Sequence, residues 1–213
     1  MRFLLFFLGA SIGSFICLIA DRFPKLSIIK PASHCFTCSN KLRLFELIPL
    51  VSILLLGFRC HHCKQRIPIK YFVLETFFGC LFLLPTFSSQ MTWFLILIVS
   101  LSVLLALFDM KEQKYPLIFW IFLTIPLLIT YPINMSFIIF IILAIVSYFI
   151  SLGFGAGDFL YLSSMPLLFN TNLLLLLLHI SCLLGIIYCI IWKQGRIPFI
   201  PFLVTAFFIV IWL

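Results

Sequence analysis

Residues 92–108, TWFLILIVSLSVLLALF, decide the fold class of this chain. The stretch is seventeen residues long and contains no charged side chain. A helix needs roughly 20 apolar residues to cross a bilayer and tolerates about 17, so this stretch predicts a membrane-spanning helix. The rest of the chain has the same character, because 64% of its 213 residues are hydrophobic and only 9% are charged. Too few polar side chains remain to cover a water-soluble globule, so we expect an all-α, polytopic membrane helical bundle.

Similar apolar runs on both sides of this stretch predict further spans. They lie at about residues 3–20, 71–87, 117–132, 136–152, 173–192 and 197–213, and a shorter one follows Asp158 at residues 159–170. The bundle is therefore expected to have about eight spans.

The net charge of +8 comes from cations that are confined to alternate connections between these spans. Thirteen of the fourteen Lys and Arg residues lie at 22–70, 111–114 and 193–196, whereas the connections at 85–91, 132–135 and 166–172 carry no charge. This is the positive-inside pattern, which places the charged connections in the cytoplasm and both termini outside. The excess of cations thus indicates orientation in a lipid bilayer and no nucleic-acid partner. Asp158 and Lys193 share the cytoplasmic side only if residues 159–170 cross the membrane.

Residues 21–70 have a mixed composition and are expected to form a cytoplasmic loop between a first span at 1–20 and a membrane-embedded domain at 71–213. The loop contains two Cys-x-x-Cys pairs, which are Cys35 and Cys38 and, after a gap of 21 residues, Cys60 and Cys63. Four thiolates in two such turns can complete a tetrahedral zinc shell, and the spacing is similar to that of a zinc ribbon. Disulfides or free thiols are the alternative, although lasting disulfides are rare in the reducing cytosol. Three histidines of the loop could replace a cysteine as a ligand. Because the four cysteines already complete the set, we expect these histidines to be solvated side chains beside the site; they are His34, His61 and His62.

Residues 44–58, between the two cysteine pairs, form an apolar segment that is too short to span a bilayer, because its apolar part is only about ten residues long. The segment is expected either to enter the membrane interface or to pack on the bundle. Glu46 lies at its edge. It is either an ion-pair partner for Lys41 or Arg43 or a carboxylate of a functional site.

Two aspartates lie at the cytoplasmic ends of predicted spans. Asp109 follows the span at 92–108 and opens a charged turn, so an ordinary juxtamembrane charge is one interpretation of it. Asp158 is the only charged residue within residues 117–192, and it follows the tripeptide Gly-Ala-Gly. An unpaired carboxylate in the hydrocarbon costs about 2.5–3.5 kcal/mol by insertion scales, so such a residue is by default a functional candidate.

Two close carboxylates at a low-dielectric rim share one proton, so that one can act as a base and the other as an acid. Asp109 and Asp158 therefore fit an aspartic peptidase that requires no metal for hydrolysis. A small polytopic transporter with rim charges and a zinc-binding loop fits the same residues, as does a scaffold protein. Transporters tend to place polar residues near the bilayer midplane, whereas every acidic residue of this chain is predicted to lie near a rim.

Five groups of motifs occur in order along residues 9–202. They are GASIGSF at 9–15 with DRFP at 21–24; SHCFTC at 33–38 with ELIPL at 46–50 and RCHHC at 59–63; FD at 108–109 with Pro116; GAGD at 155–158; and RIPFIPF at 196–202. In this order they resemble the type IV prepilin leader peptidase and N-methyltransferase family, whose members are GxGD aspartic membrane peptidases. The chain departs from the family's usual asparagine, acidic residue and lysine at Cys17, Leu117 and Leu160.

The resemblance implies that Asp109 and Asp158 are the catalytic pair of a prepilin peptidase in residues 71–213. Its substrates would be pilin-like or pseudopilin precursors, cut after a glycine in a basic leader at the cytoplasmic membrane face. The resemblance also implies N-methylation of the new N-terminus from S-adenosylmethionine by the loop at 21–70, with Glu46 as the glutamate of that activity. The loop is too small for a Rossmann-type methyltransferase and has no Gly-x-Gly-x-x-Gly, so the residues themselves add no independent support for methylation.

Overall fold

The structure is a computed structural model that describes residues 2–24, 26–28, 32–35, 37–84, 92–113, 115–150, 155–192 and 197–211. Within these ranges every regular element is a helix, and the only β pairing consists of two isolated bridges. The predicted all-α class is confirmed.

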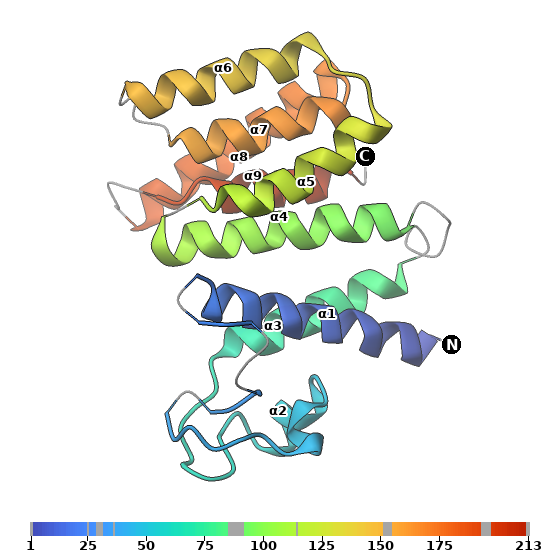
Figure 1. Cartoon of the computed structure of the whole chain (residues 1–213), viewed down its shortest axis with the longest axis vertical. Coiled ribbons are helices and arrows are strands. Elements are labelled where there is room, and N and C mark those ends of the chain that lie inside the picture. Colours follow the sequence, from blue (N-terminus) through green and yellow to red (C-terminus); the bar gives the residue numbers. More distant parts are fainter. Residues whose placement is uncertain are drawn as a thin grey trace. The chain divides into compact units, whose positions relative to one another are not determined.

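Eight helices in the described ranges coincide with the eight predicted spans (Figure 1). They are α1 (Arg2–Arg22), α3 (Ile69–Leu83), α4 (Thr92–Glu112), α5 (Leu117–Thr130), α6 (Met135–Phe149), α7 (Ala156–Leu168), α8 (Thr171–Trp192) and α9 (Ile200–Val210). Among the described residues, three stretches are long and apolar enough to cross a membrane, namely Arg2–Arg22, Phe94–Glu112 and Thr171–Trp192. The helices α5, α6 and α9 are shorter and apolar. The prediction of a helical membrane bundle is therefore confirmed.

Two helix boundaries differ from the prediction, and both affect the aspartates. The helix α4 continues to Glu112, so Asp109 lies inside its last turns and not after its end. The helix α7 begins at Ala156, so Asp158 lies in its first turn and not before it. A carboxylate is favoured there because it complements the helix dipole, and Asp158 Oδ2 accepts a hydrogen bond from the backbone N–H of Gly155 at 3.1 Å.

The helices form two compact units, Met1–Ser100 and Leu101–Leu213. In the first unit, α1 and α3 pack side by side and antiparallel (Figure 1). Glycines on α1 permit this approach, because a Cβ atom at Gly9 would lie 2.4 Å from the carbonyl oxygen of Phe78, and one at Gly13 would lie 2.6 Å from that of Leu74. Small residues four positions apart commonly allow membrane helices to approach closely. The contact brings together the two ends of the loop at residues 21–70.

The apolar segment of this loop is joined to α3, and whether it also enters the membrane interface stays a prediction. It forms a short 3-10 helix, η1 (Leu44–Leu47), and the helix α2 (Val51–Leu55). Between them, the backbone N–H of Leu50 donates to Glu75 Oε2 on α3 at 2.8 Å. The segment is therefore attached to a membrane helix through an acidic side chain.

In the second unit, α7 contacts α5, α6 and α8, and α9 packs on α8. At one end of the unit, the indole N–H of Trp120 in α5 donates to the carbonyl oxygen of Leu160 at 2.6 Å. At the other end, Asn134 Nδ2 donates to the carbonyl oxygen of Pro166 at 2.9 Å. Both ends of α7 are therefore tied to neighbouring elements of the unit, and the membrane crossing of residues 159–170 stays a prediction.

Candidate functional site

The second unit brings Asp109 and Asp158 to the same end. Asp109 Oδ2 accepts a hydrogen bond from the backbone N–H of Ile200, the first residue of α9, at 3.1 Å. Asp158 is close enough to Asp109 for their charges to interact. Both side chains are half-buried, and no described residue bonds to the Oδ1 atom of either one. Two carboxyl groups whose charges interact can divide the roles of acid and base in activating a water molecule.

Tyr115 lies beside this pair, in the connection between α4 and α5. Its ring packs on Gly157, where an added Cβ atom would lie 2.7 Å from Tyr115 Cβ. The hydroxyl oxygen of Tyr115 is buried and has no hydrogen-bond partner in the described ranges. Burial raises the pKa of Tyr115 well above its ordinary value, and the neighbouring Tyr161, Asp158 and Asp109 raise it further. The hydroxyl group therefore stays protonated at neutral pH.

The four loop cysteines come together in the first unit, as their spacing predicts. The four sulfur atoms all lie within 4.8 Å of one another, and Cys35 Sγ lies 3.8 Å from Cys63 Sγ. A tetrahedral shell with Zn–S bonds of about 2.3 Å has sulfur–sulfur distances of about 3.8 Å, so the arrangement fits a zinc ion. All four cysteines are free thiols, and the three neighbouring histidines are not members of the cluster.

The two Cys-x-x-Cys turns have the same backbone construction. The N–H groups of Cys35 and Cys60 each donate to the carbonyl oxygen five residues further on, at 3.0 and 2.9 Å. The residues that follow the two pairs, Ser39 and Lys64, have φ angles of 57° and 58°. Burial disfavours the ionised form of Cys35, but backbone hydrogen bonds from Cys38 and Thr37 outweigh it and lower the pKa of this thiol to about 6. A thiolate is the form of cysteine that binds a metal.

Glu46 is buried, with 7% of its surface exposed. Its Oε2 atom accepts a hydrogen bond from the backbone N–H of Arg43 at 2.8 Å. Its Oε1 atom is buried and has no partner among the described residues. The predicted pairing with Arg43 is therefore made to the backbone of that residue, and one carboxylate oxygen remains able to accept a hydrogen bond from a ligand.

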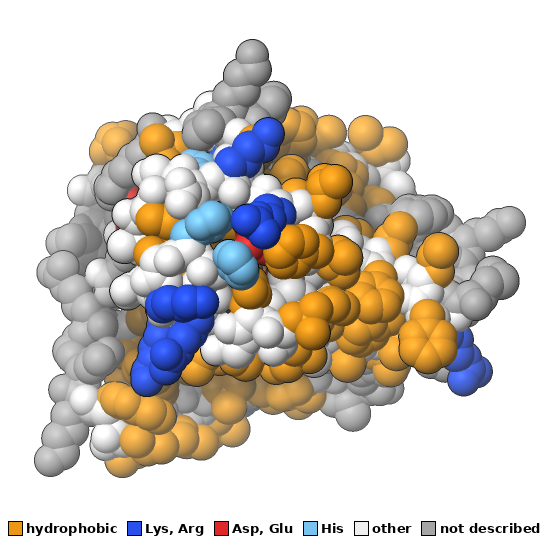
Figure 2. Space-filling model, turned by 90° about the horizontal axis from the view of Figure 1, so that it is seen from below, with side chains coloured by type: hydrophobic (Ala, Val, Ile, Leu, Met, Phe, Trp, Pro, Cys, Tyr) orange, Lys and Arg blue, Asp and Glu red, His pale blue; other side chains and the backbone are white. Residues whose placement is uncertain are grey.

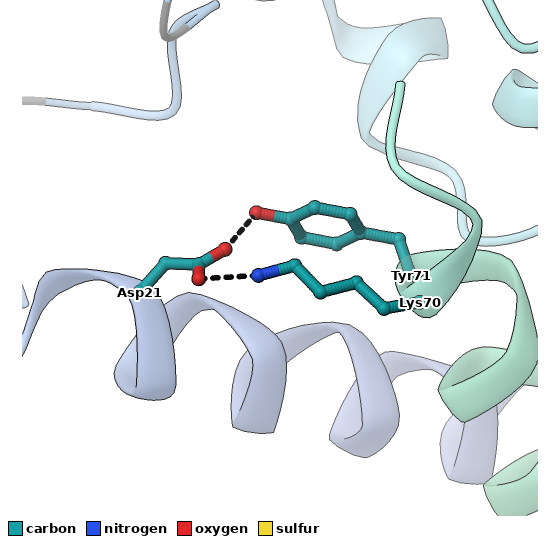
Figure 3. Close-up of polar contacts among 3 residues, drawn as sticks. All are labelled: Asp21, Lys70 and Tyr71. Atoms are coloured by element: carbon teal, nitrogen blue, oxygen red, sulfur yellow. Dashed lines mark hydrogen bonds and ion pairs between the residues drawn. The ribbon is translucent and has the colours of Figure 1, made fainter. Parts of the chain in front are cut away.

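A cluster of three side chains joins the two ends of the loop (Figure 3). Asp21, at the end of α1, accepts from Lys70 Nζ at 2.5 Å and also from the hydroxyl group of Tyr71. Lys70 and Tyr71 belong to the first turn of α3. Beside Asp21, the Arg22 guanidinium donates to the carbonyl oxygens of Ser27 and Ile28 at 3.3 and 3.2 Å. These contacts hold the start of the loop against its end.

Glu75 is a buried acidic residue on α3, and its position relative to the membrane rim stays a prediction. It lies six residues after the first residue of α3, which is about 9 Å along the helix axis. It is 3% exposed. Its Oε2 atom accepts the hydrogen bond from the Leu50 N–H. The available signal was its place within predicted span 71–87, where it is the only acidic residue.

The loop also exposes basic and hydrophobic side chains next to one another (Figure 2). Arg43, Arg59 and Lys64 are exposed, as are Leu44 and Leu55, which are 86% and 76% exposed. Basic side chains beside apolar ones are typical of segments at a membrane interface. This surface agrees with a loop that connects two membrane helices.

These features define a class: polytopic helical membrane proteins with a pair of neighbouring aspartates and a four-cysteine loop. Residues 7–88 match the profile of the Bacterial Peptidase A24 N-terminal domain. The prepilin leader peptidase/N-methyltransferase of Bacillus subtilis (strain 168) is 30% identical over 223 aligned positions, which cover 94% of this chain and 90% of the relative. The chain belongs to the prepilin leader peptidase/N-methyltransferase family.

Two further relatives with the same name are similar over shorter stretches. The Myxococcus xanthus protein is 37% identical over 117 residues, which cover 53% of this chain and 35% of the relative. The Vibrio cholerae protein is 31% identical over 140 residues, which cover 61% of this chain and 52% of the relative. The chain therefore spans about a third and about a half of the length of these two relatives. No solved structure matches the chain.

Proposed function

We propose that this protein is a prepilin peptidase, an aspartic endopeptidase that removes the basic leader of pilin-like or pseudopilin precursors at the cytoplasmic face of the membrane. The observation that carries the proposal is the pairing of Asp109 on α4 with Asp158 on α7, whose charges interact at one end of the second unit. The names of the relatives support the choice of substrate.

In the proposed reaction, the ionised aspartate takes a proton from a water molecule while the water oxygen attacks the scissile carbonyl carbon. The protonated aspartate donates a hydrogen bond to the carbonyl oxygen, which gains negative charge. When the C–N bond breaks, the leaving nitrogen takes a proton from the pair, and the two carboxyl groups again share one proton. The backbone N–H groups of Ile200 and Gly155 each hold one oxygen of the pair, which leaves both Oδ1 atoms for these transfers.

The direct test uses the purified protein, a pilin-like peptide with a basic leader and S-adenosylmethionine, with both products analysed by mass spectrometry. We expect one cut within the leader, and we expect hydrolysis to continue in a chelator because carboxylates activate the water. A protein that inserts normally and leaves the peptide intact would instead favour the transporter with a zinc-binding loop.

The cytoplasmic orientation of the dyad can be tested by labelling. A cysteine at Ile133, which is 62% exposed in the connection between α5 and α6, should react with an impermeant reagent in intact cells. A cysteine at Lys111, near Asp109, should react only after permeabilisation, because the positive-inside rule places that connection in the cytoplasm. The unsubstituted chain is the control, because it shows how much label its own cysteines take up. Labelling of the Lys111 variant in intact cells contradicts the proposed orientation.

A second activity, N-methylation of the new N-terminus, is favoured by the buried Oε1 atom of Glu46. S-adenosylmethionine supplies the methyl group when it is bound. Glu46 would take a proton from the α-ammonium group, since only the neutral amine is a nucleophile. The zinc ion would be held by Cys35, Cys38, Cys60 and Cys63, where it stabilises the fold of the loop.

Replacing Glu46 with glutamine should separate the two activities. The glutamine oxygen can still accept the Arg43 N–H, so the loop should remain folded, but an amide cannot take a proton. We expect methylation to fall about 100-fold while cleavage changes little, as measured by the mass of the product N-terminus. Zinc content is the control for folding of the loop. If the variant methylates at the normal rate, Glu46 is not the base.

A further inference from the structure

We infer that Tyr115 is a third catalytic residue, whose hydroxyl group donates a hydrogen bond to the oxygen of the scissile carbonyl group as negative charge develops there. The inference rests on the proposed peptidase function, because it assigns a role within the same reaction.

The position of Tyr115 is fixed by its contact with the second aspartate motif. Its Cβ and Cγ atoms occupy the space that a side chain at Gly157 would need, since an added Cβ atom would lie 2.7 Å from both. Gly157 immediately precedes Asp158. The ring is therefore held against the backbone that carries one aspartate, and it interacts electrostatically with both Asp158 and Asp109.

The hydroxyl group of Tyr115 forms no hydrogen bond that would stabilise the fold of the described residues. It is buried without a hydrogen-bond partner in the part of the chain that the structure describes. A buried hydroxyl group without a partner destabilises a protein relative to phenylalanine of the same shape. The missing partner is therefore expected to be a group that arrives with the substrate. A carbonyl oxygen beside the two aspartates has the required acceptor chemistry.

The role of the hydroxyl group is donation and not proton abstraction. Burial and the adjacent carboxylates keep it protonated, as its raised pKa indicates. During the attack of water, the O–H bond of Tyr115 stays intact, and the proton of the water passes to an aspartate as before. A donor aimed at a developing oxyanion stabilises the transition state more than the ground state, so its loss should lower kcat and leave KM nearly unchanged.

Tyr161 provides a matched control. It belongs to α7 in the same unit and is fully buried, and its hydroxyl group likewise has no hydrogen-bond partner among the described residues. Its hydroxyl group lies beside that of Ser102, and no aspartate is among the groups that act on it. Replacing Tyr161 with phenylalanine therefore removes a second buried hydroxyl group close to Tyr115, without removing the one that interacts with both aspartates.

The experiment compares Tyr115→Phe, Tyr161→Phe and Asp158→Asn in full-length protein, with leader-peptide cleavage and the thermal unfolding midpoint as the two measurements. For Tyr115→Phe we expect kcat to fall about 100-fold, KM to stay within about twofold, and the midpoint to stay the same or rise. Tyr161→Phe should keep the wild-type kcat.

Three outcomes would overturn the inference. In the first, Tyr115→Phe cleaves at the wild-type rate while Asp158→Asn is inactive, so the peptidase function stands and Tyr115 has no part in it. In the second, Tyr115→Phe and Tyr161→Phe lose activity and stability together, which indicates packing alone. In the third, Asp158→Asn also cleaves normally, and then the proposed function fails as well.

Discussion

Replacing Asp158 with asparagine is expected to abolish leader cleavage while the protein remains inserted in the membrane at normal abundance. Asparagine has the shape of aspartate but cannot take or share a proton. Asp109→Asn should have the same effect, because the two carboxylates act as one unit. We expect each variant to lose about 1,000-fold or more in kcat, and the double variant to be no worse than either single one.

Asp21→Asn is the control for this prediction. Asp21 is also a membrane-rim aspartate, but it is paired with Lys70 and Tyr71 in the other unit. A partly exposed ion pair contributes at most about 1 kcal/mol, so we expect cleavage to fall less than tenfold. Appreciable cleavage by Asp158→Asn would refute the dyad, and a transporter would again be the leading explanation of the rim charges.

Removal of the cysteine ligands has the second large expected effect. The purified wild-type protein should carry about one zinc ion per chain. Cys60→Ser or Cys35→Ser should reduce the zinc content nearly to zero. A serine hydroxyl group is a poor zinc ligand, and three thiolates leave the coordination shell incomplete. The measurement is elemental analysis of protein dialysed against metal-free buffer. The loop should also become sensitive to protease, since metal binding and folding are coupled.

Cys80→Ser and Cys182→Ser are matched controls, because both residues are exposed cysteines of the membrane helices and lie outside the cluster. Their metal content should equal that of the wild type. A chelator should act slowly through the stability of the loop and should not stop hydrolysis at once. Unchanged zinc in Cys60→Ser would show that the four sulfur atoms do not form the site.

The sequence alone determined those features that depend on length, composition and local spacing. The uncharged run at 92–108 and its equivalents predicted every helix of the bundle within a few residues. The short helix after Asp158 was predicted from the charge distribution, because Asp158 and Lys193 can lie on the same side only if the chain crosses the membrane between them, and that crossing stays a prediction. The metal cluster followed from two Cys-x-x-Cys pairs, because each pair forms its turn locally and only their meeting depends on the fold.

Only the tertiary structure decided which side chains meet. Glu75 accepts a hydrogen bond from the backbone of Leu50, which lies 25 positions earlier in the chain, and Tyr115 lies beside Asp158 with its hydroxyl group unpaired among the described residues. Neither contact could be predicted from the sequence. A helix that is apolar on every side has no separate polar and apolar faces, so its sequence does not indicate which side packs against the other helices. Its rotation about its own axis is set by contacts such as that of Gly9 with Phe78. Those contacts exist only when two helices are packed together. Because they set the rotation of each helix, they also determine which polar atoms lie in the same site.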